Sequence, residues 1–389
     1  MRTAVTEMFG IDVPIFAFSH CRDVVAAVTK AGGMGVLGAA AHSPEQLEID
    51  LDWIEAEVGD RPYGVDIIVP LSYAGSEAGG LSIEEVRALI PPQHRAFVAD
   101  ILRRYDVPEL PDDAAGPGGE PSSREGPAGD AGAGMIFSAE RADPQLEIAL
   151  AHRTALVVNA LGPPTEHMID RARAEGRRIG ALAGAAQHAE RHVRAGVDLI
   201  VAQGYEAGGH TGEIGSMVLI PEIVDAVGDT PVLGAGGIGR GRQMAAAMAL
   251  GAAGVWCGSV WLTTDEAETH PVVKQKFLAA GSADTVRSRS RTGKPARQLR
   301  SAWTDEWDGP ETPMPLAMPM QPVLVDGALQ RIDRAAHRPG SGAEKLANYF
   351  VGQIVGTMNR SKPAAQVVYE MIDEFIEAAQ SLGRQLDAG

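Results

Sequence analysis

Short apolar runs recur along most of the chain, and nearly every run is followed by a stretch with helical spacing. Eight of the runs have the length and composition of buried strands, and they lie at 13–18, 34–37, 64–69, 156–158, 179–182, 199–202, 231–233 and 254–256. Strands that alternate with helices form a parallel sheet. A doubly wound open sheet usually has fewer strands, whereas a TIM barrel has eight. The sequence therefore predicts an α/β fold of the (β/α)8 TIM-barrel type.

Two segments depart from this rhythm. Residues 106–134 include 12 Gly or Pro among 29 positions, and seven acids against one Arg. Such a segment buries too little apolar surface to order itself, so we expect a mobile insertion after a long helix at 83–105. The alternation stops beyond the eighth strand and its helix. We expect a barrel over 1–280 that contains the Gly/Pro-rich loop, and a C-terminal extension over 281–389 that packs on the barrel and ends in a helix at 366–382.

Length and charge narrow the class of partner. The 389 residues suit a barrel of about 250 residues with additions. The formal net charge is −17, and such a surface repels both a nucleic-acid backbone and an anionic membrane. The first residues lack the basic start and apolar core of a signal peptide, and no apolar run is long enough to span a bilayer. We expect a cytoplasmic protein with no nucleic-acid or membrane partner; a homo-oligomer stays open.

Cysteine usage excludes a disulfide framework. Cys21 and Cys257 are the only two cysteines, and neither has a CxxC partner. They cannot form a cysteine metal cluster either. No other set of ligands occurs at the spacing of a metal site, so we expect no metal.

The strongest chemical signal follows the last two predicted strands. The seventh strand runs directly into Gly236 and Gly237, and a helix begins a few residues later. Glycines let backbone N–H groups approach an anion, and the helix behind adds its positive end. The eighth strand repeats the device with Gly258 and Ser259. These loops are where barrels commonly bind phosphates, so we expect a phosphate site; the alternative is that the glycines only form tight turns.

A second signal is the loop QGYEAGGHTG at 203–212, which follows the sixth predicted strand. A loop this rich in glycine can lie flat against a planar ligand. His210 would then act on the substrate as an acid, a base or a hydrogen-bond donor. The alternative is a histidine whose ring is satisfied by a carbonyl within the turn.

Taken together, these segments resemble the nitronate monooxygenase (2-nitropropane dioxygenase) family, and the related flavin-dependent enoyl-acyl-carrier-protein reductases share the two motifs. The resemblance covers 14–40, 63–69, the loop 203–212, 234–262 and 284–300. It implies an FMN-containing barrel with His210 as the catalytic residue. It also assigns the following positions to FMN contacts: Ala17, Phe18, Asp66, Gln203, Gly208, Gly209, Gly236, Gly237, Trp256, Cys257, Gly258 and Ser259.

The chain departs from the family pattern at three places. Ala17-Phe18 stands where the first strand usually ends in Pro-Met. Asp66 replaces a flavin-contacting Asn, and a carboxyl group donates no hydrogen bond unless it is protonated. Ala160 stands where members that oxidise propionate 3-nitronate carry a second His. The loss of that donor weakens the expected hold on a nitronate.

A run of cations follows the barrel: Arg287, Arg289, Arg291, Lys294, Arg297 and Arg300. Most such runs are solvated faces. The alternative is a landing site for the phosphorylated tail of coenzyme A or an acyl carrier protein.

The expected function is therefore that of an FMN-dependent oxidoreductase with a small-molecule substrate. It would oxidise alkyl nitronates with O2 to a carbonyl compound and nitrite, as a nitronate monooxygenase does. One alternative is an NAD(P)H-dependent flavin reductase of an enoyl or related acyl thioester. Another is a cofactor-free barrel that binds a sugar phosphate or serves as a scaffold.

Overall fold

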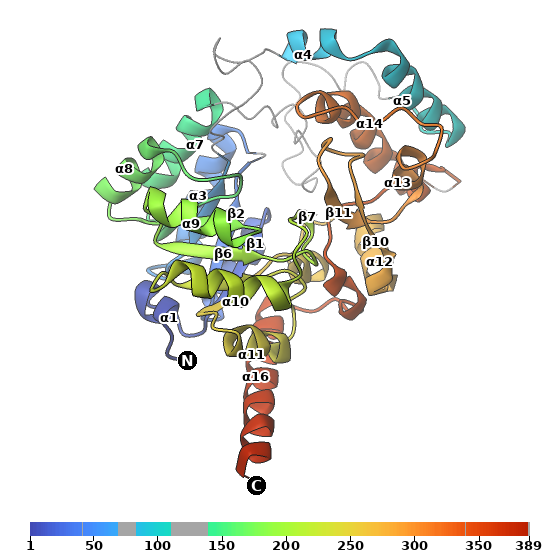
Figure 1. Ribbon diagram of the computed structural model, residues 1–389. Coiled ribbons are helices and arrows are strands. Elements are labelled where there is room, and N and C mark those ends of the chain that lie inside the picture. Colours follow the sequence, from blue (N-terminus) through green and yellow to red (C-terminus); the bar gives the residue numbers. More distant parts are fainter. Residues whose placement is uncertain (41, 69–82, 110–138, 339, 388–389) are drawn as a thin grey trace.

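Eight parallel strands close into a barrel in the computed structural model, which describes residues 1–40, 42–68, 83–109, 139–338 and 340–387. The strands lie next to one another in the order β1 (Ile15–Ser19), β2 (Met34–Gly38), β3 (Gly64–Ile67), β4 (Leu156–Asn159), β5 (Arg178–Ala183), β6 (Leu199–Gln203), β8 (Val232–Ala235) and β9 (Gly254–Cys257). The predicted TIM-barrel fold is confirmed, because each expected run carries one strand of the barrel (Figure 1).

Helices surround the barrel: α2 (Arg22–Lys30), α3 (Pro44–Val58), α7 (Ala139–Ala151), α8 (Glu166–Ala174), α9 (Ala186–Ala195), α10 (Ser216–Val227) and α11 (Gly241–Ala249), with α1 (Ala4–Phe9) near the N-terminus. The eighth place is taken by α16 (Ala364–Asp387), which packs against α2 and α11 and contributes Val367, Val368 and Met371 to the barrel's outer core. The chain thus closes its helix layer with its last helix, the one expected at 366–382. The end of α16 projects beyond the body of the molecule (Figure 1).

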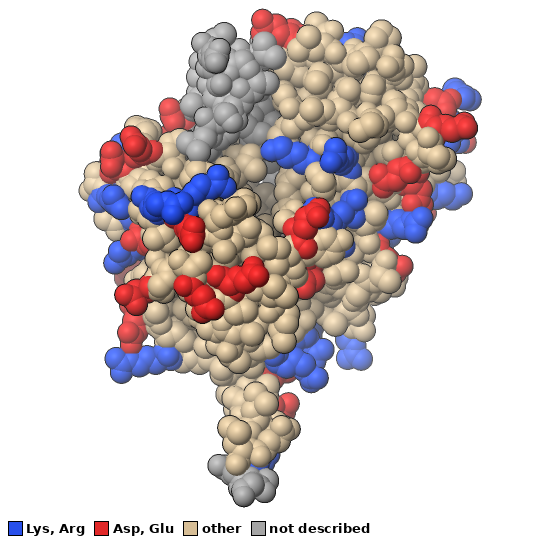
Figure 2. Space-filling view, in the orientation of Figure 1, with Lys and Arg blue, Asp and Glu red and all other residues tan. Residues whose placement is uncertain are grey.

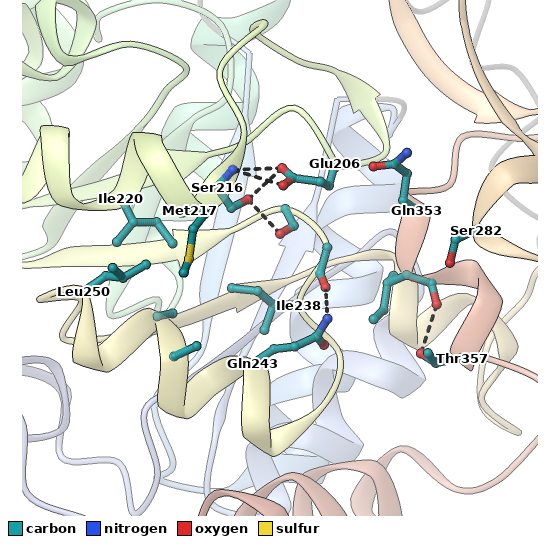
Figure 3. Close-up of a pocket in the computed structure, with 15 residues that line it drawn as sticks. Glu206, Ser216, Met217, Ile220, Ile238, Gln243, Leu250, Ser282, Gln353 and Thr357 are labelled. Carbon is teal, nitrogen blue, oxygen red and sulfur yellow. Dashed lines mark hydrogen bonds between the residues drawn. The ribbon is translucent and has the colours of Figure 1, made fainter. Parts of the chain in front are cut away.

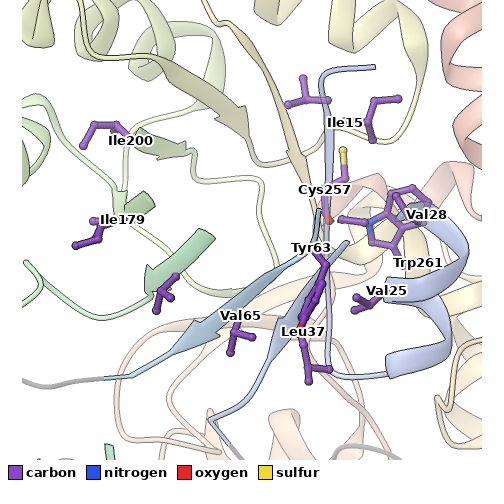
Figure 4. Packing of buried hydrophobic residues seen from close by; sticks show 14 of the residues in the cluster. Ile15, Val25, Val28, Leu37, Tyr63, Val65, Ile179, Ile200, Cys257 and Trp261 are labelled. Carbon is purple, nitrogen blue, oxygen red and sulfur yellow. The ribbon is translucent and has the colours of Figure 1, made fainter. Parts of the chain in front are cut away.

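Side chains alternate between two cores along each strand. Phe16, Val36 and Val158 belong to a cluster inside the barrel, whereas Leu37 and Val65 belong to the cluster between strands and helices (Figure 4). This period of two follows from the pleat of a strand. It therefore determines which rim residues can face a ligand at the mouth of the barrel.

A third core lies outside the barrel and its helix layer. It joins α5 (Pro92–Arg104) to α12 (Pro271–Ala279), α13 (Ala302–Trp307), α14 (Met320–Ala336) and α15 (Ala343–Leu346), with Trp303 and Trp307 fully buried. Arg331 on α14 also donates to the carbonyl oxygens of Val107 and Pro108, 3.0 Å from each. The described start of the predicted insertion is therefore anchored to this core. The remainder of that insertion, from residue 110, lies outside the described residues.

The single helix expected at 83–105 is wrong. The segment forms α4 (Ile83–Leu89) and α5, because Pro91 has an extended backbone and Pro92 opens the second helix. Both helices pack against α14, and α7 covers the barrel beside β3 instead.

A small sheet connects the barrel to the extension. Its strands are β7 (Gly209–His210), β11 (Ala296–Leu299) and β10 (Thr285–Ser288), with β11 in the middle. The loop after β6 is therefore paired with residues almost ninety positions later in the chain. Within the described part of the chain, no helix is both long and apolar enough to cross a membrane.

Candidate active site

The two glycine turns lie side by side at one mouth of the barrel. β8 and β9 are neighbours, with Ala235 opposite Trp256, so their carboxyl ends open at the same rim. A Cβ atom added to Gly239 would lie 3.2 Å from the Cβ of Val260, which shows that the turns touch. β6 is the other neighbour of β8. The loop that carries His210 therefore leaves the same rim.

Backbone geometry requires glycine in the first turn. Gly236 has φ +98° and Gly237 has φ +71°, a region that L-residues with side chains rarely adopt. A Cβ on Gly236 would lie 2.9 Å from the carbonyl oxygen of Gly204. Among the described residues, the amide N–H groups of Gly237, Ile238 and Gly258 donate to no acceptor. These amides are donors that an anion such as a phosphate could bind.

The start of α11 is already capped by protein groups. Gln243 Oε1 accepts from the amides of Gly239 and Arg240 at 3.0 and 3.1 Å, and Glu374 of α16 accepts from the amide of Gly241 at 2.9 Å. The positive end of this helix, which the sequence suggested for the phosphate, is therefore neutralised in large part by a carboxylate. The turn itself supplies the donors.

A pocket of about 370 Å³ borders the same turn between α10 and α11 (Figure 3). Its walls include Glu206, Gly237, Ile220 and Leu250, and the extension adds Gln353. The Glu206 carboxylate accepts from the backbone amide of Ser216 at 2.9 Å and from its hydroxyl at 2.9 Å. The acid nearest the turn is thus held at the start of α10, directed toward Ser216 rather than toward the free amides.

His210 is anchored by the extension. In β7 it lies opposite Ala296 of β11, and its Nε2 is 2.8 Å from Oγ1 of Thr292. The Thr292 hydroxyl also lies 3.2 Å from the carbonyl oxygen of Lys294, which accepts its proton. His210 Nε2–H then donates to Thr292, and Nδ1 is left as an acceptor. Burial, and secondly the charge of Lys294, lowers the pKa of His210 to about 4, so the ring is neutral near pH 7.

Sequence reasoning missed the segment that holds this loop. The amide of Gly352 donates to Ser259 Oγ at 2.8 Å, and a Cβ on Gly208 would lie 2.9 Å from the Gly352 nitrogen. Gly208 is therefore required by close approach of the extension. Gly209 has φ +74° with open space around it. No motif in the sequence indicates residue 352, since the contact joins segments about 140 positions apart.

Strand alternation divides the residues predicted to contact FMN into those that face the inside of the barrel and those that face its outer core. Phe18, Asp66, Gln203 and Trp256 share the inward parity of the barrel's inner cluster. Phe18 stacks on Trp256 with ring centroids 6.0 Å apart. These side chains form the floor that faces the mouth.

Ala17 and Cys257 have the opposite parity and pack in the outer core. Burial raises the pKa of the Cys257 thiol to about 12. Any contact of these two residues with a cofactor therefore rests on their backbone atoms.

The cation run is not one solvated face. Arg297 is buried and donates to the Tyr205 carbonyl oxygen at 3.1 and 3.2 Å. Arg291 is buried and donates to Asn348. The β10–β11 hairpin turns these residues inward, so they cannot form a landing site; Arg289 and Lys294 are exposed. On the face shown in Figure 2, acidic and basic side chains are interspersed.

The fold brings together a cluster of possible metal ligands that the sequence spacing did not reveal. Ligand atoms of Cys21, Asp23 and Glu268 lie within 4.8 Å of one another. The Cys21 thiol donates to the carbonyl oxygen of Glu266, and burial raises its pKa to about 11. A metal needs the thiolate, so we propose no metal at this cluster. Both cysteines are free, as expected.

Comparison with known proteins places this geometry in a family. A family model described as nitronate monooxygenase matches residues 113–374. The chain is 57% identical to "Putative monooxygenase Rv1533" of Mycobacterium tuberculosis, over 98% of each chain. A nitroalkane oxidase structure from Streptomyces ansochromogenes is 27% identical, with a TM-score of 0.74 and coverage of 98% of this chain and 100% of that one.

A structure of FabK from Thermotoga maritima is also similar, at 26% identity, a TM-score of 0.70 and 99% coverage of both chains. The two glycine turns and the His210 loop therefore occur in a chain whose whole length matches flavin oxidoreductases. This excludes the cofactor-free barrel. The chain belongs to the nitronate monooxygenase family and is a flavin-dependent oxidoreductase.

Proposed function

We propose that the protein binds FMN and oxidises alkyl nitronates with O2 to a carbonyl compound and nitrite. The single observation that supports this most is the shared rim: two adjacent turns with free amides open at the mouth from which the His210 loop departs. A phosphate and a planar ring could be held there together, with a neutral imidazole on the loop above.

The chain's own residues fit FMN. The amides of Gly237, Ile238 and Gly258 would hold the phosphate, and the floor formed by Phe18, Asp66, Gln203 and Trp256 would lie beneath the isoalloxazine. When bound, the flavin would supply the electron transfer between substrate and oxygen. The protein would position the substrate and limit access of water.

His210 has the properties of a base or an acceptor. Its Nε2 is fixed by Thr292 and its ring is neutral near pH 7, so Nδ1 can take a proton from carbon or accept a hydrogen bond. The positive charge of Lys294 acts on His210. That charge would attract an anionic nitronate to this side of the mouth. It would take the place of the second His, whose position is occupied by Ala160 in this chain.

Replacement of His210 tests the proposal. The variant His210→Asn should bind FMN with an unchanged visible spectrum, while kcat with a nitronate falls by about 100-fold or more. The exposed His337 at the end of α14 gives a matched control, and His337→Asn should leave kcat unchanged. Wild-type turnover by His210→Asn would remove this residue from the mechanism.

A second candidate is an NAD(P)H-dependent reductase of an enoyl or related acyl thioester. It is favoured by Ala160 at the position of the second His and by the full-length similarity to FabK. Anaerobic mixing separates the two. Flavin bleaching by nitronate alone supports the oxidase, and rapid bleaching by NADH or NADPH supports the reductase.

A further inference from the structure

Asp66 is a carboxyl group isolated in the floor of the mouth. It lies near the carboxyl end of β3, has inward parity and is 3% exposed. Its strand neighbours at this level are Gly38 of β2 and Val158 of β4, neither of which carries a charge. No hydrogen-bond partner of its carboxyl oxygens occurs among the described residues. An ionised carboxylate in such a place is strongly destabilising unless a partner neutralises it.

The described titratable groups around Asp66 supply no cation. Directly after β1, His20 donates through Nδ1 to the carbonyl oxygen of Gly38 at 2.8 Å, and burial lowers its pKa to about 4. Beyond β2, His42 and Arg22 are both bonded to Asp50 of α3. Across the mouth, His210 is neutral for the reason given above. Burial therefore raises the pKa of Asp66 well above its usual value, with no opposing charge.

A neutral carboxylic acid reproduces part of the hydrogen-bonding capacity of a carboxamide. It offers one O–H donor and one C=O acceptor, where Asn offers two N–H donors and one C=O acceptor. The replacement of the family's Asn by Asp66 thus preserves a donor as long as the proton stays. A protonated acid that is buried without a described partner, with inward parity near the mouth, is poised to donate to a ligand there.

We propose that Asp66 is held as a neutral acid whose O–H donates to an acceptor atom on the isoalloxazine of bound FMN. This rests on the proposed FMN binding and adds that Asp66 positions the ring. Loss of the proton would remove the donor and place a negative charge beside the ring. FMN binding should therefore weaken as Asp66 ionises, whereas an Asn at this position should be insensitive to pH.

The first test uses the protein without flavin. The folded-state pKa of Asp66 is raised, so its contribution to stability is present below the unfolded-state value of 3.8 and is lost as pH rises toward the folded-state value. Asp66→Asn should therefore be more stable than wild type near pH 7, with a margin that shrinks as pH falls toward about 4. Urea unfolding at several pH values measures this. A less stable Asp66→Asn near pH 7 would show an ionised, compensated Asp66 and overturn the proposal.

Asp50 is the matched control, because it is also a buried aspartate but is bonded to Arg22, His42 and Gln46. The pKa of Asp50 is lowered from its usual value: burial alone would raise it, and the hydrogen bonds and charges of these partners outweigh burial. Asp50→Asn should therefore destabilise the protein near pH 7, the opposite sign to Asp66→Asn.

The second test titrates FMN by fluorescence quenching from about pH 7.5 to about pH 9.5, where the FMN phosphate stays a dianion. Wild-type Kd should rise at the alkaline end, and Asp66→Asn should show a flat profile. Asp66→Leu, which lacks the donor, should bind about fivefold to tenfold more weakly than Asp66→Asn. Equal FMN binding by all three at every pH would reject the role of Asp66 while leaving FMN binding intact. Failure of every variant to bind FMN would reject the proposed cofactor itself, and the unfolding data would still report the protonation state.

Discussion

The barrel and the C-terminal extension contribute different kinds of groups to one site. Among the described residues, the barrel rim offers unpaired groups: the amides of Gly237, Ile238 and Gly258 donate to no acceptor, and the Asp66 carboxyl has no hydrogen-bond partner. The extension has unpaired buried atoms of its own, such as Ser290 Oγ and Gln298 Nε2, but the groups that hold the His210 loop are bonded. Arg297 is bonded to the Tyr205 carbonyl oxygen and His210 to Thr292. The rim therefore has free amides for a ligand, while Arg297 and Thr292 of the extension fix the His210 loop.

This difference indicates which region would recognise a ligand, namely the barrel rim, and which region positions the His210 loop, namely the extension. A group that faces a ligand must remain unsatisfied in its absence, at a cost to stability. A group that fixes a loop is most effective when it is fully bonded and buried. Substitutions at the rim should therefore affect ligand binding first, and substitutions in the extension should affect stability and turnover together.

The largest effect is expected at Gly236. Alanine there would combine a φ of +98° with a Cβ 2.9 Å from two oxygen atoms, so the turn must shift and its amides move. Gly236→Ala should weaken FMN binding by about 100-fold or more, as measured by fluorescence titration. Gly228 is the control, because its φ is +58° but nothing lies within 4 Å of an added Cβ. Gly228→Ala should lose about 1 kcal/mol of stability and keep wild-type affinity for FMN.

The barrel and the extension also differ in how much of each could be predicted from the sequence. Strand alternation and glycine turns are local patterns, so eight strands and the turns at Gly236 and Gly258 could be located from the residues alone. The extension depends on contacts between distant segments, such as Gly352 with Ser259, and local spacing contains no trace of them. The cation run illustrates the limit, since neither a solvated face nor a landing site anticipates Arg297 buried beneath Tyr205.

A smaller but distinct effect is expected at Arg297, which holds the loop to β11. Methionine retains much of the volume but leaves the Tyr205 carbonyl oxygen without its donors. Arg297→Met should lower the free energy of unfolding by about 2–3 kcal/mol and lower kcat, with a lesser change in FMN affinity. Arg300 lies in the same segment but is exposed and paired with Asp305. Arg300→Met should leave the free energy of unfolding nearly unchanged. Equal losses of unfolding free energy in Arg297→Met and Arg300→Met would contradict the role given to Arg297 in holding the loop.

The smallest effect concerns Lys294, the exposed cation whose charge acts on His210. Burial is the larger cause of the lowered pKa of about 4, and Lys294 is the second. Removal of a positive charge makes the protonated ring less unfavourable, so Lys294→Met should raise the pKa of His210, by a small amount because the charge is solvated. Arg289→Met, in the same hairpin and also exposed, should leave the pKa of His210 in place. NMR titration of the His210 ring measures the shift directly, and the acid limb of kcat/KM should move by the same amount if Nδ1 must be free. If the pKa of the His210 ring shifts but the acid limb of kcat/KM does not, Lys294 acts on His210, but the imidazole does not take part in the reaction.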